Sequence, residues 1–143
     1  MTRITVSAVL LALAIPATSY AHVSVRPRET KPGVEETYTA RVPTEKAVAT
    51  TSVVLEVPDG VTILKVADAE GMKHEETKTG DRITTITWTR EIKPRESAEF
   101  VFTAKNPATG AQIVWKVHQH YADGTVSDWM PATTLSPTEA KDR

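Results

Sequence analysis

The 143-residue sequence contains no cysteine, and this absence excludes several chemistries at once. Without thiols, the chain forms no disulfide, no cysteine-ligated zinc site, no iron–sulfur cluster and no thiol nucleophile. A surplus of charge of one sign is also missing, because 17 Lys and Arg stand against 18 Asp and Glu. Since there is no basic excess to release counterions from a phosphate backbone, we expect no nucleic acid partner.

Long hydrophobic runs are absent except near the start of the chain. Arg3 precedes an almost unbroken apolar run over residues 4–15, and Ser19 and Ala21 put small side chains at the −3 and −1 positions of a cleavage site. This layout is typical of a secretory signal peptide, and the run is shorter than the roughly 20 residues that span a bilayer. We therefore predict that residues 1–21 are a cleaved signal peptide. The mature chain is then expected to be periplasmic or secreted, with no membrane anchor.

Helical periodicity is nearly absent from the rest of the sequence, whereas apolar and polar residues often alternate. Ala98, Phe100, Phe102 and Ala104 fall on one face of a period-two pattern, which indicates a half-buried strand. Similar patterns, separated by turn residues, predict strands over residues 36–42, 52–57, 61–66, 82–90, 98–105, 113–121 and 125–129.

Seven to nine short strands at this spacing favour one fold class. We predict an all-β, single-domain β-sandwich of the immunoglobulin or cupredoxin-like type, without a disulfide, over residues 22–135. About 120 residues bury enough surface for a two-sheet core. The last eight residues, 136–143, are polar and are predicted to form a flexible tail.

Cleavage after Ala21 gives His22 a free α-amine beside its imidazole. The amine nitrogen and the ring Nδ1 can then hold one metal ion in a six-membered chelate ring. Both are borderline nitrogen donors that suit Cu(II), which binds most strongly among the divalent first-row ions. Both nitrogens must lose protons to bind, so affinity should fall in acid. The alternative is that His22 merely happens to follow the cleavage site.

Several motifs in this sequence resemble those of the YcnI-like family of exported bacterial copper-binding domains. They occur at residues 22–27, 36–39, 42–46, 55–61, 100–107, 121–124 and 127–129. The resemblance extends over nearly all of the mature chain, and it depends on the order and spacing of the motifs together. It implies a β-sandwich, in agreement with the strand pattern.

The resemblance also implies a single-histidine brace for one Cu(II). Carried over by motif, the metal-site residues are His22, Glu45 and Trp129. The implied role is an extracytoplasmic Cu(II) chaperone, scavenger or buffer in copper homeostasis, with no enzymatic activity. The implied partner is a membrane copper transporter or another extracytoplasmic copper protein. By contrast, Trp88 and Trp115 share strand faces with apolar residues and are predicted to lie in the core.

Two alternatives stay open at this point. His118 and His120 are two apart on a predicted strand, so their side chains share a face and form either a second metal pair or part of an exposed polar surface. A second histidine ligand would favour a copper-dependent oxidative enzyme. A metal-free interaction module of the cell envelope is the other alternative function.

Overall fold

A computed structural model describes residues 22–137, and all regular structure in this range is β-strand. The predicted signal peptide, residues 1–21, and the end of the predicted tail, residues 138–143, lie outside the described residues. Among the described residues there is no helix with the length and apolar character needed to cross a membrane.

The described chain forms twelve strands, more than the seven to nine predicted. They are β1 (Ser24–Arg26), β2 (Glu29–Thr30), β3 (Glu35–Pro43), β4 (Thr50–Glu56), β5 (Thr62–Val66), β6 (Lys73–Thr79), β7 (Arg82–Ile92), β8 (Ser97–Lys105), β9 (Gln112–Val114), β10 (Lys116–Tyr121), β11 (Val126–Trp129) and β12 (Ala132–Leu135).

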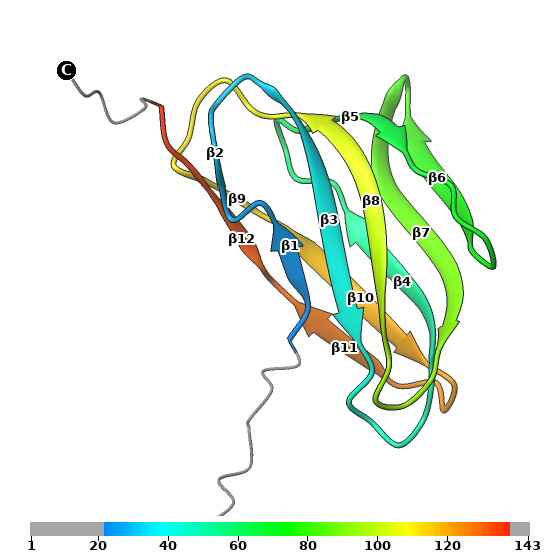
Figure 1. Ribbon diagram of the computed structural model, residues 1–143. Coiled ribbons are helices and arrows are strands. Elements are labelled where there is room, and N and C mark those ends of the chain that lie inside the picture. Colours follow the sequence, from blue (N-terminus) through cyan, green and yellow to red (C-terminus); the bar gives the residue numbers. More distant parts are fainter. Residues whose placement is uncertain (1–21, 138–143) are drawn as a thin grey trace, which may run out of the picture.

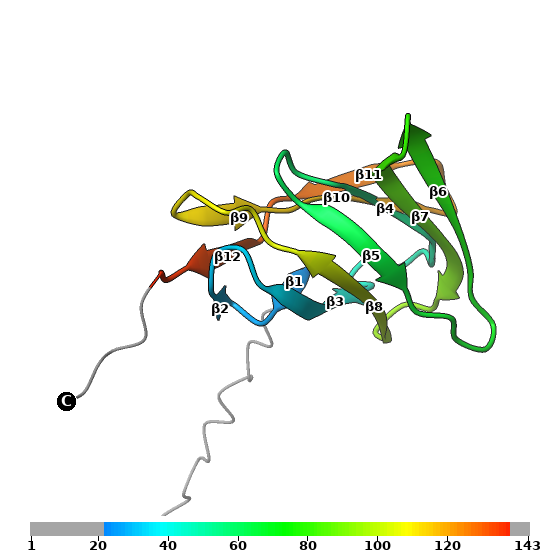
Figure 2. The ribbon, with the colours of Figure 1, turned by 90° about the horizontal axis from the view of Figure 1, so that it is seen from above.

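The strands form a β-sandwich, as predicted (Figures 1 and 2). One layer is a four-stranded sheet in the order β1-β3-β8-β5, and the other is a five-stranded sheet in the order β11-β10-β4-β7-β6. A small third sheet, β2-β12-β9, lies at one end. β1 is an edge strand of the four-stranded sheet, and β11 is an edge strand of the five-stranded sheet.

The core lies between the two main sheets and is built by period-two alternation. On β8, the predicted inward residues Phe100 and Phe102 are at most 1% exposed. The ring centroids of Phe100 and Trp88 are 5.0 Å apart, and those of Phe102 and Trp115 are 5.4 Å apart. Each large apolar side chain buried in this way contributes roughly 1.5–3 kcal/mol to the free energy of unfolding.

The predicted strand over residues 113–121 is wrong in one respect, because it divides at Trp115. β9 precedes that residue in the small sheet, and β10 follows it in the five-stranded sheet. The Trp115 backbone N–H donates to the carbonyl of Pro131 at 2.8 Å, and its indole donates to Thr133 Oγ1 at 3.0 Å. The backbone changes its hydrogen-bonding partners at Trp115, but every second side chain, from Ile113 to Val117, still points into the core.

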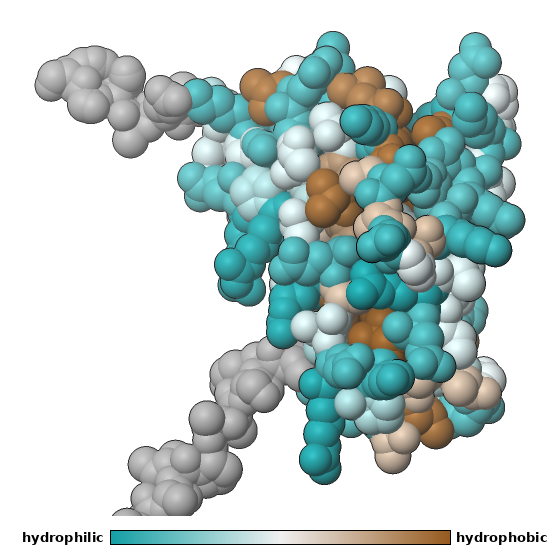
Figure 3. All heavy atoms as spheres, turned by 45° about the vertical axis from the view of Figure 1, so that its right-hand side comes forward, coloured by the Kyte–Doolittle hydropathy of each residue, from teal (hydrophilic) through white to brown (hydrophobic). Residues whose placement is uncertain are grey.

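The strands missing from the prediction are short or lack an apolar face. β1, β2 and β12 have four residues or fewer. β6 has seven residues, of which six are exposed and only His74 is half-buried, so it shows no alternation between apolar and polar side chains. Figure 3 shows one face of the molecule, where apolar side chains occur in small groups among polar ones.

Candidate metal centre

His22 and Trp129 meet where the edges of the two main sheets come together. His22 is exposed and lies just before β1, whereas Trp129 is half-buried and ends β11. Their ring centroids are 5.3 Å apart, and the ring planes are inclined at 63°. The fold thus brings together two of the three predicted site residues from nearly opposite ends of the described chain.

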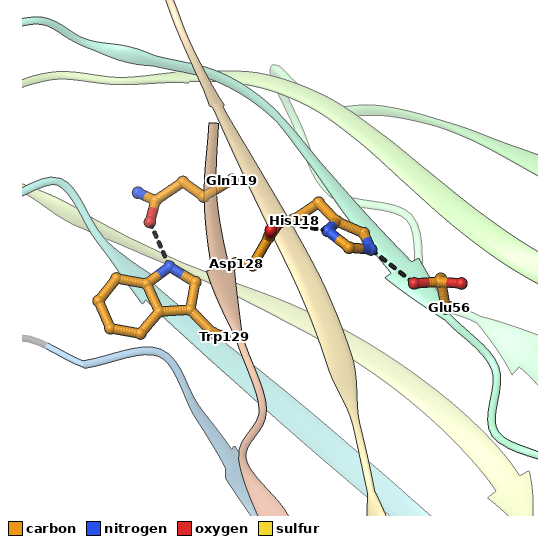
Figure 4. Close-up of polar contacts among 5 residues, drawn as sticks. All are labelled: Glu56, His118, Gln119, Asp128 and Trp129. Carbon is orange, nitrogen blue, oxygen red and sulfur yellow. Dashed lines mark hydrogen bonds and ion pairs between the residues drawn. The ribbon is translucent and has the colours of Figure 1, made fainter. Parts of the chain in front are cut away.

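A buried amide sets the position of the Trp129 ring (Figure 4). The indole Nε1–H of Trp129 donates to Gln119 Oε1 at 3.0 Å. The Gln119 side chain is fully buried, and its Nε2 donates to the Pro43 carbonyl at 2.8 Å and to Thr50 Oγ1 at 2.7 Å. Both amide protons and the amide oxygen have partners. Burial of this polar group therefore leaves no hydrogen bond unmade, and the cost of removing it from water is offset.

Gln119 is a site neighbour that the sequence interpretation missed. The signal was present, because the inward face of β10 is otherwise apolar. Val117 and Tyr121 precede and follow it on that face, and both are buried. A polar residue between two core positions needs a partner, and here the partners come from three other segments of the chain.

Two observations place the segment containing Glu45 near His22. β1 pairs with β3 in an antiparallel register that sets Ser24 opposite Arg41. His22 precedes Ser24 by two residues and Pro43 follows Arg41 by two, so both lie toward the same end of these strands. The Pro43 carbonyl is also the group that accepts a hydrogen bond from the amide behind Trp129. Glu45 follows two residues later, at the same end of the sandwich.

The residues on either side of Glu45 are fixed. Thr44 is 1% exposed, and its hydroxyl donates to the Ile92 carbonyl at 2.9 Å. The Lys46 ammonium lies 4.4 Å from the centroid of the Tyr121 ring. The Glu45 carboxylate between them is exposed and forms no hydrogen bond or ion pair with other described residues. Its two oxygens are therefore open to a cation.

The other two tryptophans lie in the core, as predicted. Trp88 and Trp115 are both 0% exposed, and neither contributes to the edge where His22 lies. The Trp88 indole nitrogen is buried without a hydrogen-bond partner. Of the three tryptophans, Trp129 is therefore the one that has both an exposed part and a contact with the His22 ring.

His118 is engaged with two carboxylates on the other side of β10 (Figure 4). Its Nδ1 lies 2.5 Å from Asp128 Oδ1, and its Nε2 lies 2.6 Å from Glu56 Oε2. Ionised carboxylates only accept hydrogen bonds, so this geometry favours a ring that donates from both nitrogens, an imidazolium. The hydrogen bond to Asp128, followed by that to Glu56, raises the pKa of His118 above its usual range.

This arrangement does not support a second metal site at His118 and His120. A histidine ligand needs a free nitrogen lone pair, and both nitrogens of His118 are engaged by carboxylates. Among the residues that the structure describes, no group of three or more His, Asp or Glu side chains is arranged to hold a metal ion. The centre predicted at His22 differs in kind, because one of its two nitrogens would belong to the backbone amine.

The architecture defines an immunoglobulin-like β-sandwich without cysteine. The chain is similar to an uncharacterized protein from Nocardia farcinica with an immunoglobulin-like fold, with a TM-score of 0.73 and 22% identity over 81% of this chain and 99% of that one. It is also similar to the seventh ScaB type I cohesin of Pseudobacteroides cellulosolvens, with a TM-score of 0.51 and 11% identity over 85% and 96% of the two chains. At these identities, the likeness shows the fold alone.

Residues 22–142 match a family model described as a domain of unknown function, DUF1775. The chain is also 37% identical over 123 residues to the copper-binding protein CutI of Bacillus subtilis strain 168. The chain therefore belongs to the DUF1775 family, and its predicted likeness to YcnI-like domains is confirmed. The match covers 84% of this chain but only 59% of the length of CutI.

Proposed function

We propose that the mature chain begins at His22 and binds one Cu(II) outside the cytoplasm, in the periplasm or as a secreted protein. The α-amine and the ring Nδ1 of His22 chelate the ion, Glu45 supplies an oxygen, and Trp129 covers one side of the metal. The observation that carries this proposal is the contact between the exposed His22 ring and Trp129 across the edges of the two sheets.

The comparisons support this proposal. The relative with 37% identity is named a copper-binding protein, which favours the same role here. The family match begins at residue 22, the residue that follows the predicted cleavage site. This start agrees with a functional unit in which His22 comes first.

The donor set suits Cu(II). Two neutral nitrogens and one anionic oxygen favour Cu(II) over Cu(I), and the carboxylate partly neutralises the ion. The Trp129 ring offers a face for a cation–π contact, and its hydrogen bond to Gln119 holds that ring in one orientation. Gln119 is thus a positioning residue behind the metal centre, comparable to the outer partners that orient the ligands of other metal sites.

We assign the protein a binding role, as a chaperone, scavenger or buffer in copper homeostasis, rather than an enzymatic one. An oxidative copper site with a T-shaped brace needs a second histidine ligand. One candidate, His118, lies on the opposite face of β10 from Gln119 and bonds to two carboxylates. The partner in copper transfer is a membrane copper transporter or another extracytoplasmic copper protein.

The α-amine is the donor whose removal tests the proposal most directly. The experiment compares the chain beginning at His22 with the same chain selectively acetylated at its α-amine, using electron paramagnetic resonance of Cu(II) and isothermal titration. We expect one Cu(II) per chain with two coordinated nitrogens, and a loss of affinity above about a hundredfold on acetylation, beyond the usual effect of an outer-sphere change. N-terminal sequencing of the exported protein checks where the mature chain starts.

The matched control is the same acetylation applied to a His22→Ala chain. That chain has already lost the imidazole, so acetylation should change its weak binding little. An unchanged Cu(II) spectrum after acetylation of the His22 chain would contradict the proposal, as would an exported form that begins at another residue.

A further inference from the structure

A groove of about 460 Å³ lies beside the proposed copper centre, and its lining is strongly basic. His22 is one of the lining residues, and three arginines, Arg26, Arg28 and Arg41, line the rest of it together with two small side chains. Within residues 22–137, no Asp or Glu lines the groove. This is a local concentration of positive charge on a chain whose total charge is close to balanced.

The register of two strands brings the arginines together. Val25 of β1 is 1% exposed and points into the core, so its neighbour Arg26 points to the outer face. Arg26 lies opposite Thr39 of β3, and Arg41 lies two residues further along the same strand and is also exposed. Such diagonal neighbours on one sheet face are about 7–8 Å apart at the backbone. Arg28 follows β1 and reaches the same groove.

None of the three guanidinium groups has a carboxylate partner among the described residues. Among the described side chains, His74 and His118 are the residues that contact carboxylates in ion-pair geometry. Three cationic side chains that line one groove repel one another and create a field that attracts anions. Guanidinium groups bind carboxylates in a planar, two-point geometry, and the groove volume is in the range of small-molecule sites, roughly 300–1,000 Å³.

The same field that attracts anions repels a metal cation that carries no anionic ligand. A hydrated Cu(II) approaching His22 is repelled by the arginines, whereas an anionic copper complex is attracted by them. On this basis, and resting on the proposed copper-binding function, we propose that the groove binds a small polycarboxylate and that Cu(II) reaches His22 as the complex of that anion.

The transfer is a ligand exchange without a redox step. Bonds from Cu(II) to the carboxylate oxygens break as bonds to the amine and imidazole nitrogens of His22 form, the protons leave those nitrogens, and copper stays in the Cu(II) state. The exchange proceeds toward the protein because borderline nitrogen donors suit Cu(II) better than carboxylates do. The released anion remains paired with the arginines and then dissociates.

The first measurement uses citrate as the probe and the copper-free chain that begins at His22. Isothermal titration should detect binding that weakens as salt rises, and the double variant Arg26→Gln/Arg41→Gln should lose about tenfold or more in affinity, as expected for two lost charge-assisted bonds. The control is Lys65→Gln/Lys105→Gln, which removes the same charge from the opposite half of the same sheet. That control should bind citrate like the unchanged chain.

The second measurement follows the rate of copper loading by stopped-flow tryptophan fluorescence. One donor is Cu(II) citrate, which is anionic, and the other is Cu(II) bis-glycinate, which is neutral. Loading from citrate should be faster than loading from glycinate by about tenfold at low salt, in the range of electrostatic steering. The arginine double variant should lose this preference, and the lysine control should keep it.

Each result decides the proposal. Failure of citrate to bind the copper-free chain, or equal binding by the arginine variant, would overturn it while leaving copper binding at His22 intact. Citrate binding without copper binding would instead disprove the proposed function and keep the groove as an anion site. Tighter binding of inorganic phosphate, or of an Asp- and Glu-rich peptide, would assign the groove to a different ligand and overturn the polycarboxylate assignment.

Discussion

The two faces of the β10–β11 pair carry polar side chains that are neighbours in sequence but have different partners and different roles. On the inner face, Gln119 is buried and neutral, and it directs Trp129 toward the exposed His22 ring. On the outer face, His118 bonds to Asp128, and the pKa of its ring is raised. Figure 4 shows the two groups on opposite sides of the same strands.

The difference shows that a histidine in a strand or beside one has no fixed function. His118 has two carboxylate partners that keep both its nitrogens protonated, so it stabilises the pairing of its strand with its neighbours. His22 precedes an edge strand and contacts an aromatic ring, so its imidazole is compatible with a metal ion. Position relative to partners, more than residue type, separates a structural histidine from a candidate ligand.

The strongest test of this contrast compares the effects of alanine substitutions at His22 and at His118 on Cu(II) affinity. His22→Ala should lower Cu(II) affinity by more than about a hundredfold, because it removes a direct ligand rather than an outer-sphere group. His118→Ala should leave the affinity within about threefold, since neither nitrogen of His118 is available to a metal. Isothermal titration and Cu(II) paramagnetic resonance on both variants check this. A similar loss in His118→Ala would refute the distinction between the two faces.

Replacing the buried amide of Gln119 tests the role of the inner face. Gln119→Leu leaves the Trp129 indole, the Pro43 carbonyl and the Thr50 hydroxyl without their bonds. We expect the free energy of unfolding to fall by about 1–3 kcal/mol. Cu(II) affinity should fall by about tenfold, the lower end of the range for outer-sphere partners of a metal site. Urea unfolding and isothermal titration measure the two effects.

A second readout separates a positioning role from a merely structural one. Cu(II) should quench the fluorescence of Trp129 in the unchanged chain, because that ring contacts His22, whereas Trp88 and Trp115 lie in the core. Trp129→Phe should remove most of the quenching and keep the emission of the buried pair. If Gln119→Leu lowers stability but leaves both quenching and affinity unchanged, then Gln119 has no positioning role.

The smallest effect concerns the outer face and its dependence on pH. Since hydrogen bonds to Asp128 and Glu56 raise the pKa of His118 in the folded state, folding is favoured by the protonated ring. The resulting stabilisation is fully present below the unfolded-state pKa of about 6.5 and is lost as pH rises through the higher folded-state pKa. Because the two carboxylates are exposed to solvent, we expect this stabilisation to be less than about 1 kcal/mol.

The measurement is the difference in unfolding free energy between the unchanged chain and His118→Gln from pH 5 to pH 9. The difference should decrease as pH rises. A difference that grows with pH would mean that the ring is neutral in the folded protein, and would remove the contrast with His22.

The fold was largely predictable because burial alternates with period two along strands such as β8 and β10. The inward positions of β8, the core location of Trp88 and the hairpin at Asp123 all follow from period-two patterning and turn residues. Patterning fails where a strand has no buried face, as in β6, and where a strand changes sheets without changing its inward side, as at Trp115.

The candidate site was only partly predictable from sequence. The chelating chemistry of His22 follows from its position after the predicted cleavage site, and the likeness to YcnI-like domains indicated Glu45 and Trp129. The arginine groove and the amide behind Trp129 were not predicted, because each is made of residues from strands that are adjacent only in the folded sheets.

The sequence by itself determined the alternation of inward and outward side chains, because that depends on the backbone geometry of a strand and on local turn residues. Only the tertiary structure decided which tryptophan lies against His22, that His118 bonds to two carboxylates, and that three arginines share one groove. These contacts depend on which strand edges meet across the sandwich, and long-range pairing of that kind leaves no local periodic signal in the chain.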